Sequence, residues 1–237
     1  GEYGDSKFDD EFIWAANELY VTTKKEKYAT GYPLAKEYSV PSWPNVGTLG
    51  LYTLNNYKKE VAAKYDTAQI TAKILKLADE IAAEANVKSQ YRVPIGTYYD
   101  FIWGSNSVCA NEAIVLLNAY KITGKQGYLK AALSGLDYML GRNATVYSFV
   151  TGYGSKQVMY PHHRPSAGDK VVAPVPGMLA GGPQNTNNPE SGCTYNAEEP
   201  ATKFKDNVCS YSTNEIAINW NAPLAYVAGA IEAFMKK

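Results

Sequence analysis

Apolar residues recur at helical spacing in several separate segments of the chain. The clearest case lies between positions 67 and 86, where Ile70, Ile74, Leu77 and Ile81 mark one face of a helix. Weaker versions of the same period, bounded by acidic residues, glycines or prolines, occur elsewhere. The predicted helices cover 9–23, a short piece of 24–40 broken at Pro33, 46–55, 67–86, 105–123, 126–140 and a last one that includes 223–235. The pattern predicts an all-α protein with six main helices.

The last helix contains a proline that predicts where it begins. Proline is tolerated in the first turn of a helix but not in its middle. Because Pro223 precedes the apolar run, we expect the helix to begin near Asn221. That start leaves Glu215 on the turn before the helix.

Regular patterning vanishes between positions 144 and 214. Such a stretch is far longer than the usual connection of about 4–6 residues, and long loops are commonly functional or disordered. The interspersed tyrosine, histidine and arginine residues favour an ordered region.

Two decapeptides one hundred positions apart resemble each other. LYVTTKKEKY covers 19–28 and AYKITGKQGY covers 119–128, with Tyr, Thr, Lys and Tyr at matching positions. Each ends one predicted helix and starts the next. The similarity indicates a repeated helical hairpin, as in α/α toroids and solenoids.

Composition narrows the class of protein. The 237 residues are 46% hydrophobic, and 23 basic residues balance 23 acidic ones, so neither nucleic acid nor an anionic membrane is indicated as a partner. No run approaches the roughly 18 apolar residues of a membrane span, and no leader precedes Gly1. We expect a secreted protein, its signal peptide removed, that acts on an uncharged or small substrate.

The cysteines bear on the compartment. Cys193 and Cys209 flank a polar loop and are either two unrelated thiols or a disulfide. A disulfide there would stabilise the protein by roughly 3 kcal/mol and would imply an oxidising compartment.

The candidate chemistry lies at positions 204–222. Asp206, Tyr211 and Glu215 precede the last helix, and carboxylates among aromatic rings suit acid–base chemistry on a polyol. Glu215 could equally satisfy backbone donors at a helix start, and Asp206 could cap a loop.

Two gapped motifs make the chain resemble glycoside hydrolase family 9, the cellulases once called family E. The first motif comprises Ser148-Phe-Val-Thr151, Gly154, Lys156 and Pro161-His162-His163-Arg164. The second comprises Phe204, Asp206, Tyr211, Glu215, Ala217 and Asn221-Ala222. Further similarity lies in DDEFIWAANELY, Trp103-Gly104-Ser105 and VPGMLAGGPQN, so the resemblance spans nearly the whole chain.

The resemblance implies an (α/α)6 toroid of twelve helices with a cleft across one end. Six main helices agree with half of that toroid. The family's Asp-x-x-Asp, which holds and deprotonates the attacking water, has no counterpart in residues 1–237. The chain therefore resembles the C-terminal half of the catalytic domain, with the N-terminal half as its partner.

By resemblance, Glu215 is the general acid in the inverting hydrolysis of β-1,4-glucosidic bonds in cellulose or related β-glucans. A glutamate acid needs its protonated form stabilised by burial or by a neighbouring carboxylate, and Asp206, the family's second active-site mark, is the candidate neighbour.

Other residues follow from the same resemblance. His162 and Arg164 match the His-x-Arg of the first motif and would hold sugar hydroxyls or orient the carboxylates, unless they make structural bonds; His163 is less constrained. Aromatic rings suited to stacking on pyranose faces are Trp103, Tyr211, Trp220 and Trp43, of which Trp43 and Trp220 also suit core packing.

The resemblance implies no cofactor for catalysis but a structural calcium. Ser6, Asp10 and Glu11 resemble part of the family's calcium site, although they also suit an acidic first helical turn. The segment 43–46 lacks the aspartates that complete the site in many members.

Two other function classes remain open. Because no base is found, the chain could be a non-catalytic glucan-binding half-domain. Another (α/α)6 enzyme, such as a polysaccharide lyase or a glucuronyl hydrolase, is the third reading, which both motifs disfavour.

Overall fold

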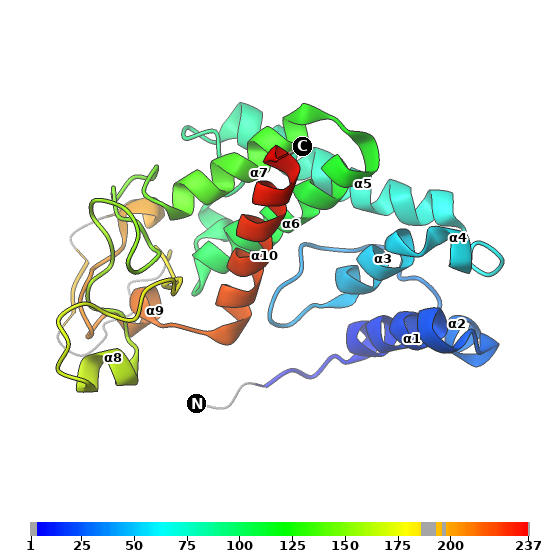
Figure 1. Cartoon of the computed structure of the whole chain (residues 1–237), viewed down its shortest axis with the longest axis horizontal. Coiled ribbons are helices and arrows are strands. Elements are labelled where there is room, and N and C mark those ends of the chain that lie inside the picture. The colour runs from blue at the N-terminus through cyan, green and yellow to red at the C-terminus, as the bar shows by residue number, and fades with distance from the viewer. Residues whose placement is uncertain (1–3, 186–192, 196–197, 237) are drawn as a thin grey trace.

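The computed structural model describes residues 4–185, 193–195 and 198–236. These residues form α-helices and no strand, and six helices of ten or more residues carry the architecture (Figure 1). They are α1 (Asp9–Thr23), α3 (Gly47–Asn56), α5 (Thr67–Ala83), α6 (Ser105–Thr123), α7 (Gln126–Met139) and α10 (Ile218–Met235). The prediction of an all-α protein with six main helices is confirmed.

Short elements connect the long ones. Helix α2 (Glu26–Gly31) ends before Pro33, as predicted, whereas α4 (Lys58–Val61) was not predicted. The remaining short elements are α8 (Arg164–Gly168), α9 (Tyr211–Asn214) and the 3-10 turns Tyr98–Asp100 and Pro200–Thr202.

Helix α5 ends earlier than predicted and continues as a π-helical turn, Glu84–Lys88. The side-chain amide of Asn86 donates to the carbonyl of Ala82 at 2.8 Å, the acceptor that the backbone N–H of Asn86 would use in an α-helix. On the predicted face, three isoleucines are buried, but Ala78 rather than Leu77 completes it.

Helix α10 begins at Ile218, so the predicted start near Asn221 is wrong. The first turn is anchored from outside the helix, because the Asn221 side chain accepts from the N–H of Leu179 at 2.7 Å and donates to the carbonyl of Ala217 at 2.9 Å. Pro223 then removes one bond, to the carbonyl of the exposed Asn219, which water can satisfy. Glu215 does lie on the turn before the helix.

The two similar decapeptides form matching corners. Lys24 and Gly124 both have positive φ, 58° and 71°, and their N–H groups donate to Tyr20 and Tyr120. In each corner the threonine hydroxyl accepts from the lysine N–H two positions on, from Lys25 to Thr23 at 3.3 Å and from Lys125 to Thr123 at 3.2 Å. The predicted repeat of the helical hairpin is confirmed down to its hydrogen bonds.

The long helices enclose one main apolar core. Helix α6 packs on α5, α7 and α10, and α1 packs on α3 (Figure 1). None of the helices in the described ranges is long and apolar enough to cross a membrane.

The irregular region has a second core of its own. Phe149, Leu179 and Ala180 are fully buried there, against the first turns of α6 and the end of α7. Where it is described, the region is ordered, as predicted, and it gathers with α8 and α9 at one end of the molecule (Figure 1).

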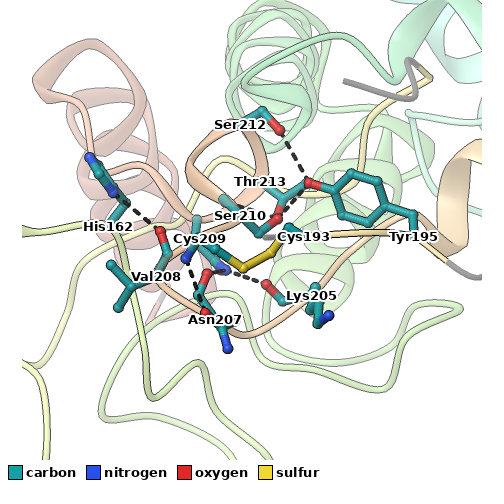
Figure 2. The surroundings of a disulfide bond; sticks show 11 residues. His162, Cys193, Tyr195, Lys205, Asn207, Val208, Cys209, Ser210, Ser212 and Thr213 are labelled. Atoms are coloured by element: carbon teal, nitrogen blue, oxygen red, sulfur yellow. Dashed lines mark hydrogen bonds between the residues drawn. A yellow bond between two sulfur atoms is a disulfide. The ribbon is translucent and has the colours of Figure 1, made fainter. Parts of the chain in front are cut away.

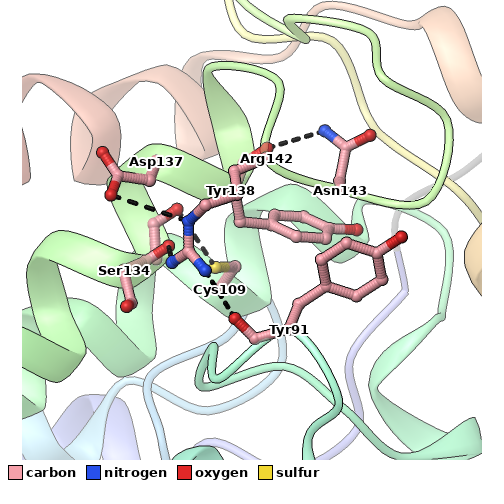
Figure 3. A network of polar contacts seen from close by, with 8 residues as sticks. Tyr91, Cys109, Ser134, Asp137, Tyr138, Arg142 and Asn143 are labelled. Carbon is pink, nitrogen blue, oxygen red and sulfur yellow. Dashed lines mark hydrogen bonds and ion pairs between the residues drawn. The ribbon is translucent and has the colours of Figure 1, made fainter.

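An arginine fastens the segment before α6 to α7 (Figure 3). Arg142 donates to the carbonyls of Tyr91 at 2.6 Å and Ser134 at 3.2 Å, and its Nε lies 3.7 Å from Asp137. The network fixes the connection that leads toward the first turn of α6, where the candidate site begins.

Candidate active site

A cavity of about 830 Å³ opens where three helices begin. Its walls come from the segment before α3, from the segment before α6 together with the first turn of α6, and from the first turn of α10. Helix α9 closes one side. The lining residues that carry polar or aromatic groups are Ser42, Trp43, Tyr99, Trp103, Ser107, His162, Tyr211, Glu215, Asn219 and Trp220. Helices from distant parts of the chain therefore converge on one site.

The backbone of Glu215 is held on three sides. Its N–H donates to the carbonyl of Tyr211 at 2.8 Å, and its carbonyl accepts from Gly181 at 3.1 Å. The preceding carbonyl, of Asn214, accepts from the N–H of His162 at 2.8 Å. Segments more than thirty and fifty positions upstream thus fix the place of the side chain.

The carboxylate of Glu215 faces aromatic rings. Trp103 donates from its indole nitrogen to Glu215 Oε2 at 3.0 Å. Among the described residues that line the cavity, Glu215 is the one acidic side chain, and none is a lysine or an arginine. A half-buried acid in such surroundings can act on a neutral ligand.

Exposed rings form one wall. Trp103 and Tyr211 are 44% and 39% exposed, and their centroids lie 5.6 Å apart at 42°. Trp43 is also exposed and lines the cavity, so these three predicted rings meet there. Such rings can stack on the C–H faces of a sugar.

Trp220 lies deeper. It is 8% exposed and wedged between Gly104 and Gly181, at each of which an added Cβ would lie 3.0 Å or less from the ring. The residue lines the cavity floor, yet most of it packs as core.

The two histidines differ. His162 lines the cavity, and its ring lies 5.9 Å from Tyr211, with Nδ1 3.4 Å from the carbonyl of Val208. His163 instead caps α8 through Ser166, 2.9 Å from its hydroxyl. Arg164 begins α8 and is exposed, and neither residue lines the cavity.

Asp206 is engaged outside the cavity. Its two carboxylate oxygens accept from the N–H groups of Met159 and Tyr160, each at 2.9 Å. Asp206 therefore caps the loop that leads to His162. Asp206 is not among the residues that line the cavity.

Of the two possibilities left open for Cys193 and Cys209, the structure has the disulfide, with the Cα atoms 5.7 Å apart (Figure 2). Beside it, the Tyr195 hydroxyl bonds Ser210 at 2.5 Å and lies 3.3 Å from Ser212 (Figure 2). These bonds tie down the chain that leads into α9 and Glu215.

The predicted calcium ligands lie apart from the cavity. Asp10 Oδ2 accepts from Val46 at 2.6 Å, Glu11 Oε2 is buried without a hydrogen bond, and Ser6 is exposed. A bond from its own backbone lowers the pKa of Glu11, but desolvation and the neighbouring Asp10 outweigh it and raise that pKa. The unpartnered Oε2 of Glu11 beside the Asp10 carboxylate fits one or two ligands of a hard cation, but the described residues contain no group of three His, Cys, Asp or Glu side chains that could hold a metal ion.

Several lining residues were not predicted from the sequence, among them two large exposed side chains. Tyr99 and Ile102 are exposed and line the cavity beside Trp103. Their proximity in sequence to the Trp-Gly-Ser segment was the available signal.

Comparison with known proteins matches the chain to one family over nearly its whole length. A family model for glycosyl hydrolase family 9 matches residues 1–228. The xyloglucan-specific endo-β-1,4-glucanase BoGH9A of Bacteroides ovatus is 39% identical over 241 residues, covering 98% of this chain and 40% of that protein. A cellulose 1,4-β-cellobiosidase of Acetivibrio thermocellus is 35% identical, covering 98% of this chain and 29% of that protein.

Solved structures match the fold as well. The Bacteroides ovatus GH9 structure aligns with a TM-score of 0.84 at 37% identity, covering 99% of this chain and 42% of that chain. AaCel9A in complex with cellobiose-like isofagomine aligns with a TM-score of 0.85 at 32% identity, covering 100% and 45%. The chain spans less than half the length of these relatives, so its helices correspond to part of the (α/α)6 toroid. This chain belongs to glycosyl hydrolase family 9 and covers part of its catalytic domain.

Proposed function

We propose that this chain is the C-terminal half of the catalytic domain of an inverting, endo-acting β-1,4-glucanase, and that Glu215 is its general acid. The observation that carries the proposal is a single carboxylate among the described lining residues of a cavity walled by exposed aromatic rings. That arrangement supplies a proton donor and a stacking surface for a sugar ring.

Glu215 protonates the glycosidic oxygen as the bond to the anomeric carbon breaks. An inverting enzyme needs a second carboxylate, about 6.5–9.5 Å from the first, to deprotonate the attacking water. The described lining residues supply one carboxylate, and so the base comes from the N-terminal half of the domain.

The substrate is an uncharged β-glucan. Apart from Glu215, the described lining residues present rings, amides and hydroxyls, which suit a neutral polyol better than a charged polymer. The names of the relatives, a xyloglucan-specific endoglucanase and a cellobiosidase, support cellulose or a related β-1,4-glucan.

Glu215→Gln in the protein that carries the complete domain tests the acid. Turnover of xyloglucan and of carboxymethylcellulose should fall about 10²–10⁴-fold. A β-cellobioside with a dinitrophenyl leaving group should retain far more activity, because that group departs without a proton. The exposed Glu60→Gln is the matched control. Equal turnover of both variants on polysaccharide would disprove the acid role.

The alternative is a glucan-binding half-domain, favoured by the lack of a second carboxylate among the described lining residues. The purified chain alone should bind cellohexaose without cleaving it under either reading. Adding the N-terminal half discriminates, because only a split active site gains hydrolysis.

We also propose that the protein is secreted. The Cys193–Cys209 disulfide supports this, since such bonds persist in oxidising compartments.

A further inference from the structure

The indole of Trp103 is bonded to the proposed acid across 112 positions of sequence. Its Nε1 donates to Glu215 Oε2 at 3.0 Å. We propose that Trp103 is a positioning residue that fixes the Glu215 carboxyl through Oε2, so that Oε1 is the oxygen that carries the transferable proton. The inference rests on the proposed role of Glu215 and concerns how that role is aimed.

The fold constrains Trp103 at its backbone and at its ring. Trp103 precedes Gly104, whose φ of +82° turns the chain into α6, and Trp220 fills the space beside that glycine. The indole ring itself meets Tyr211, with centroids 5.6 Å apart. Tyr211 and Glu215 are the ends of one hydrogen-bonded turn, so the backbone links the ring to the carboxylate.

The chemistry of the bond selects one oxygen. An indole N–H is a donor only, so it needs a lone pair and cannot accept the proton of a carboxylic acid. With Oε2 engaged, the proton is carried on Oε1, and Oε2 serves as the carbonyl oxygen. The same N–H bonds an ionised carboxylate more strongly than a neutral acid, which assists departure of the proton during catalysis.

Few other titratable groups face Glu215. Those that line the cavity with it are His162 from the loop before α8, Tyr211 from α9 and Tyr99 from the segment before α6. Helix α10 and the segment 40–44 add no titratable side chain to the described lining. His162 is the one imidazole among the described lining residues, so His162→Gln serves as a control in the test below.

A direct test follows the indole N–H by nuclear magnetic resonance of the purified chain. The four tryptophans give four indole resonances, and Trp103→Phe identifies the relevant one. That resonance should shift with pH in wild type and in His162→Gln, and the shift should vanish in Glu215→Gln. A shift that persists in Glu215→Gln would overturn the proposal.

The chain contains a matched control for this bond. Trp14 donates from its indole to Glu18 Oε1, also at 3.0 Å, on α1 and outside the cavity lining. The Trp14 resonance should be unaffected by Glu215→Gln. If the effect of Trp103→Phe on kcat is specific to the site, Trp14→Phe should leave kcat unchanged.

The activity test uses Trp103→Phe in the complete domain, which keeps a ring and removes the donor. We expect kcat to fall about tenfold with KM changed less than twofold, because aim rather than binding is lost. The alkaline limb of the pH–kcat profile should move up by about one pH unit, since the ionised carboxylate loses a donor. A loss confined to KM, or an unmoved profile, would refute the positioning role.

The two proposals fail in different ways. If Glu215 is not the acid, Glu215→Gln keeps its turnover while the resonance of Trp103 still responds to that substitution. If Glu215 is the acid but Trp103 does not position it, Glu215→Gln is inactive. The Trp103 resonance then does not respond to Glu215→Gln, and the pH–kcat profile does not respond to Trp103→Phe.

Discussion

Adding one methyl group at Gly104 should disturb the site more than the same change at a matched glycine. Gly104 and Gly124 both lie at positive φ, 82° and 71°, next to an end of α6. At Gly104 a Cβ would lie 2.7–2.8 Å from three ring atoms of Trp220, whereas at Gly124 nothing lies within 4 Å. The pair separates the cost of the backbone conformation from the cost of the contact.

The magnitudes follow from these two terms. A left-handed conformation costs an alanine roughly 1–2 kcal/mol, which should be the whole effect of Gly124→Ala. Overpacking of a well-filled site adds about 1–3 kcal/mol. Trp220 cannot retreat freely, because Gly181 lies so close to the same ring that a Cβ added there would sit 3.0 Å from it. The unfolding free energy should therefore fall by about 2–5 kcal/mol in Gly104→Ala.

Urea unfolding followed by tryptophan fluorescence measures both variants, and titration with cellobiose reports the site. Gly104→Ala should weaken sugar binding because the cavity floor shifts, while Gly124→Ala should leave it unchanged. If the two variants lose the same unfolding free energy, the contact with Trp220 contributes nothing and the reasoning is wrong.

Three further predictions concern stability. Replacing Cys193 and Cys209 by serine should cost about 3 kcal/mol of unfolding free energy, because the bond closes a loop with a separation of 16; a melting temperature equal to that of the oxidised protein would contradict this. Burial, with Asp100 and Glu84, raises the pKa of Glu112 well above its usual value. The stability that protonated Glu112 contributes is thus present below about pH 4.5 and is lost as pH rises. The melting temperature of Glu112→Gln should therefore rise relative to that of wild type between pH 4.5 and 7, and melting temperatures that run parallel against pH would contradict this. Finally, calcium should raise the melting temperature of EDTA-treated wild type but not of Glu11→Gln, and no response in wild type would rule the site out.

Local signals in the sequence predicted the helices well. The start of α1 follows from the acidic residues that begin at Asp9, and the end of α6 follows from Gly124. Both features act within one helical turn. Helix α10 was misplaced because its first turn is anchored by Leu179, a partner forty-two positions upstream of Asn221. No local rule contains that bond.

The site shows the same division. The motifs identified Glu215, His162 and Trp103 as cavity residues, but not how they contact one another. Spacing could not reveal that Asp206 uses both oxygens on the backbone of Met159 and Tyr160. A carboxylate nine positions away along an irregular chain has no fixed direction, and the prediction that it neighbours Glu215 stays a prediction.

The length of the irregular region has a physical explanation. A residue just before a helix has free backbone angles, and an acid must be aimed to within a fraction of an ångström. Here the carbonyl of Glu215 bonds Gly181, the carbonyl before it bonds His162, and the Asn214 amide donates to the carbonyls of Lys205 and Asn207. These four partners come from three passes of the chain, near 162, 181 and 205–207, which together over-determine one position. Shortening any of them should loosen the acid before it unfolds the helices, since the main core lies among the helices themselves.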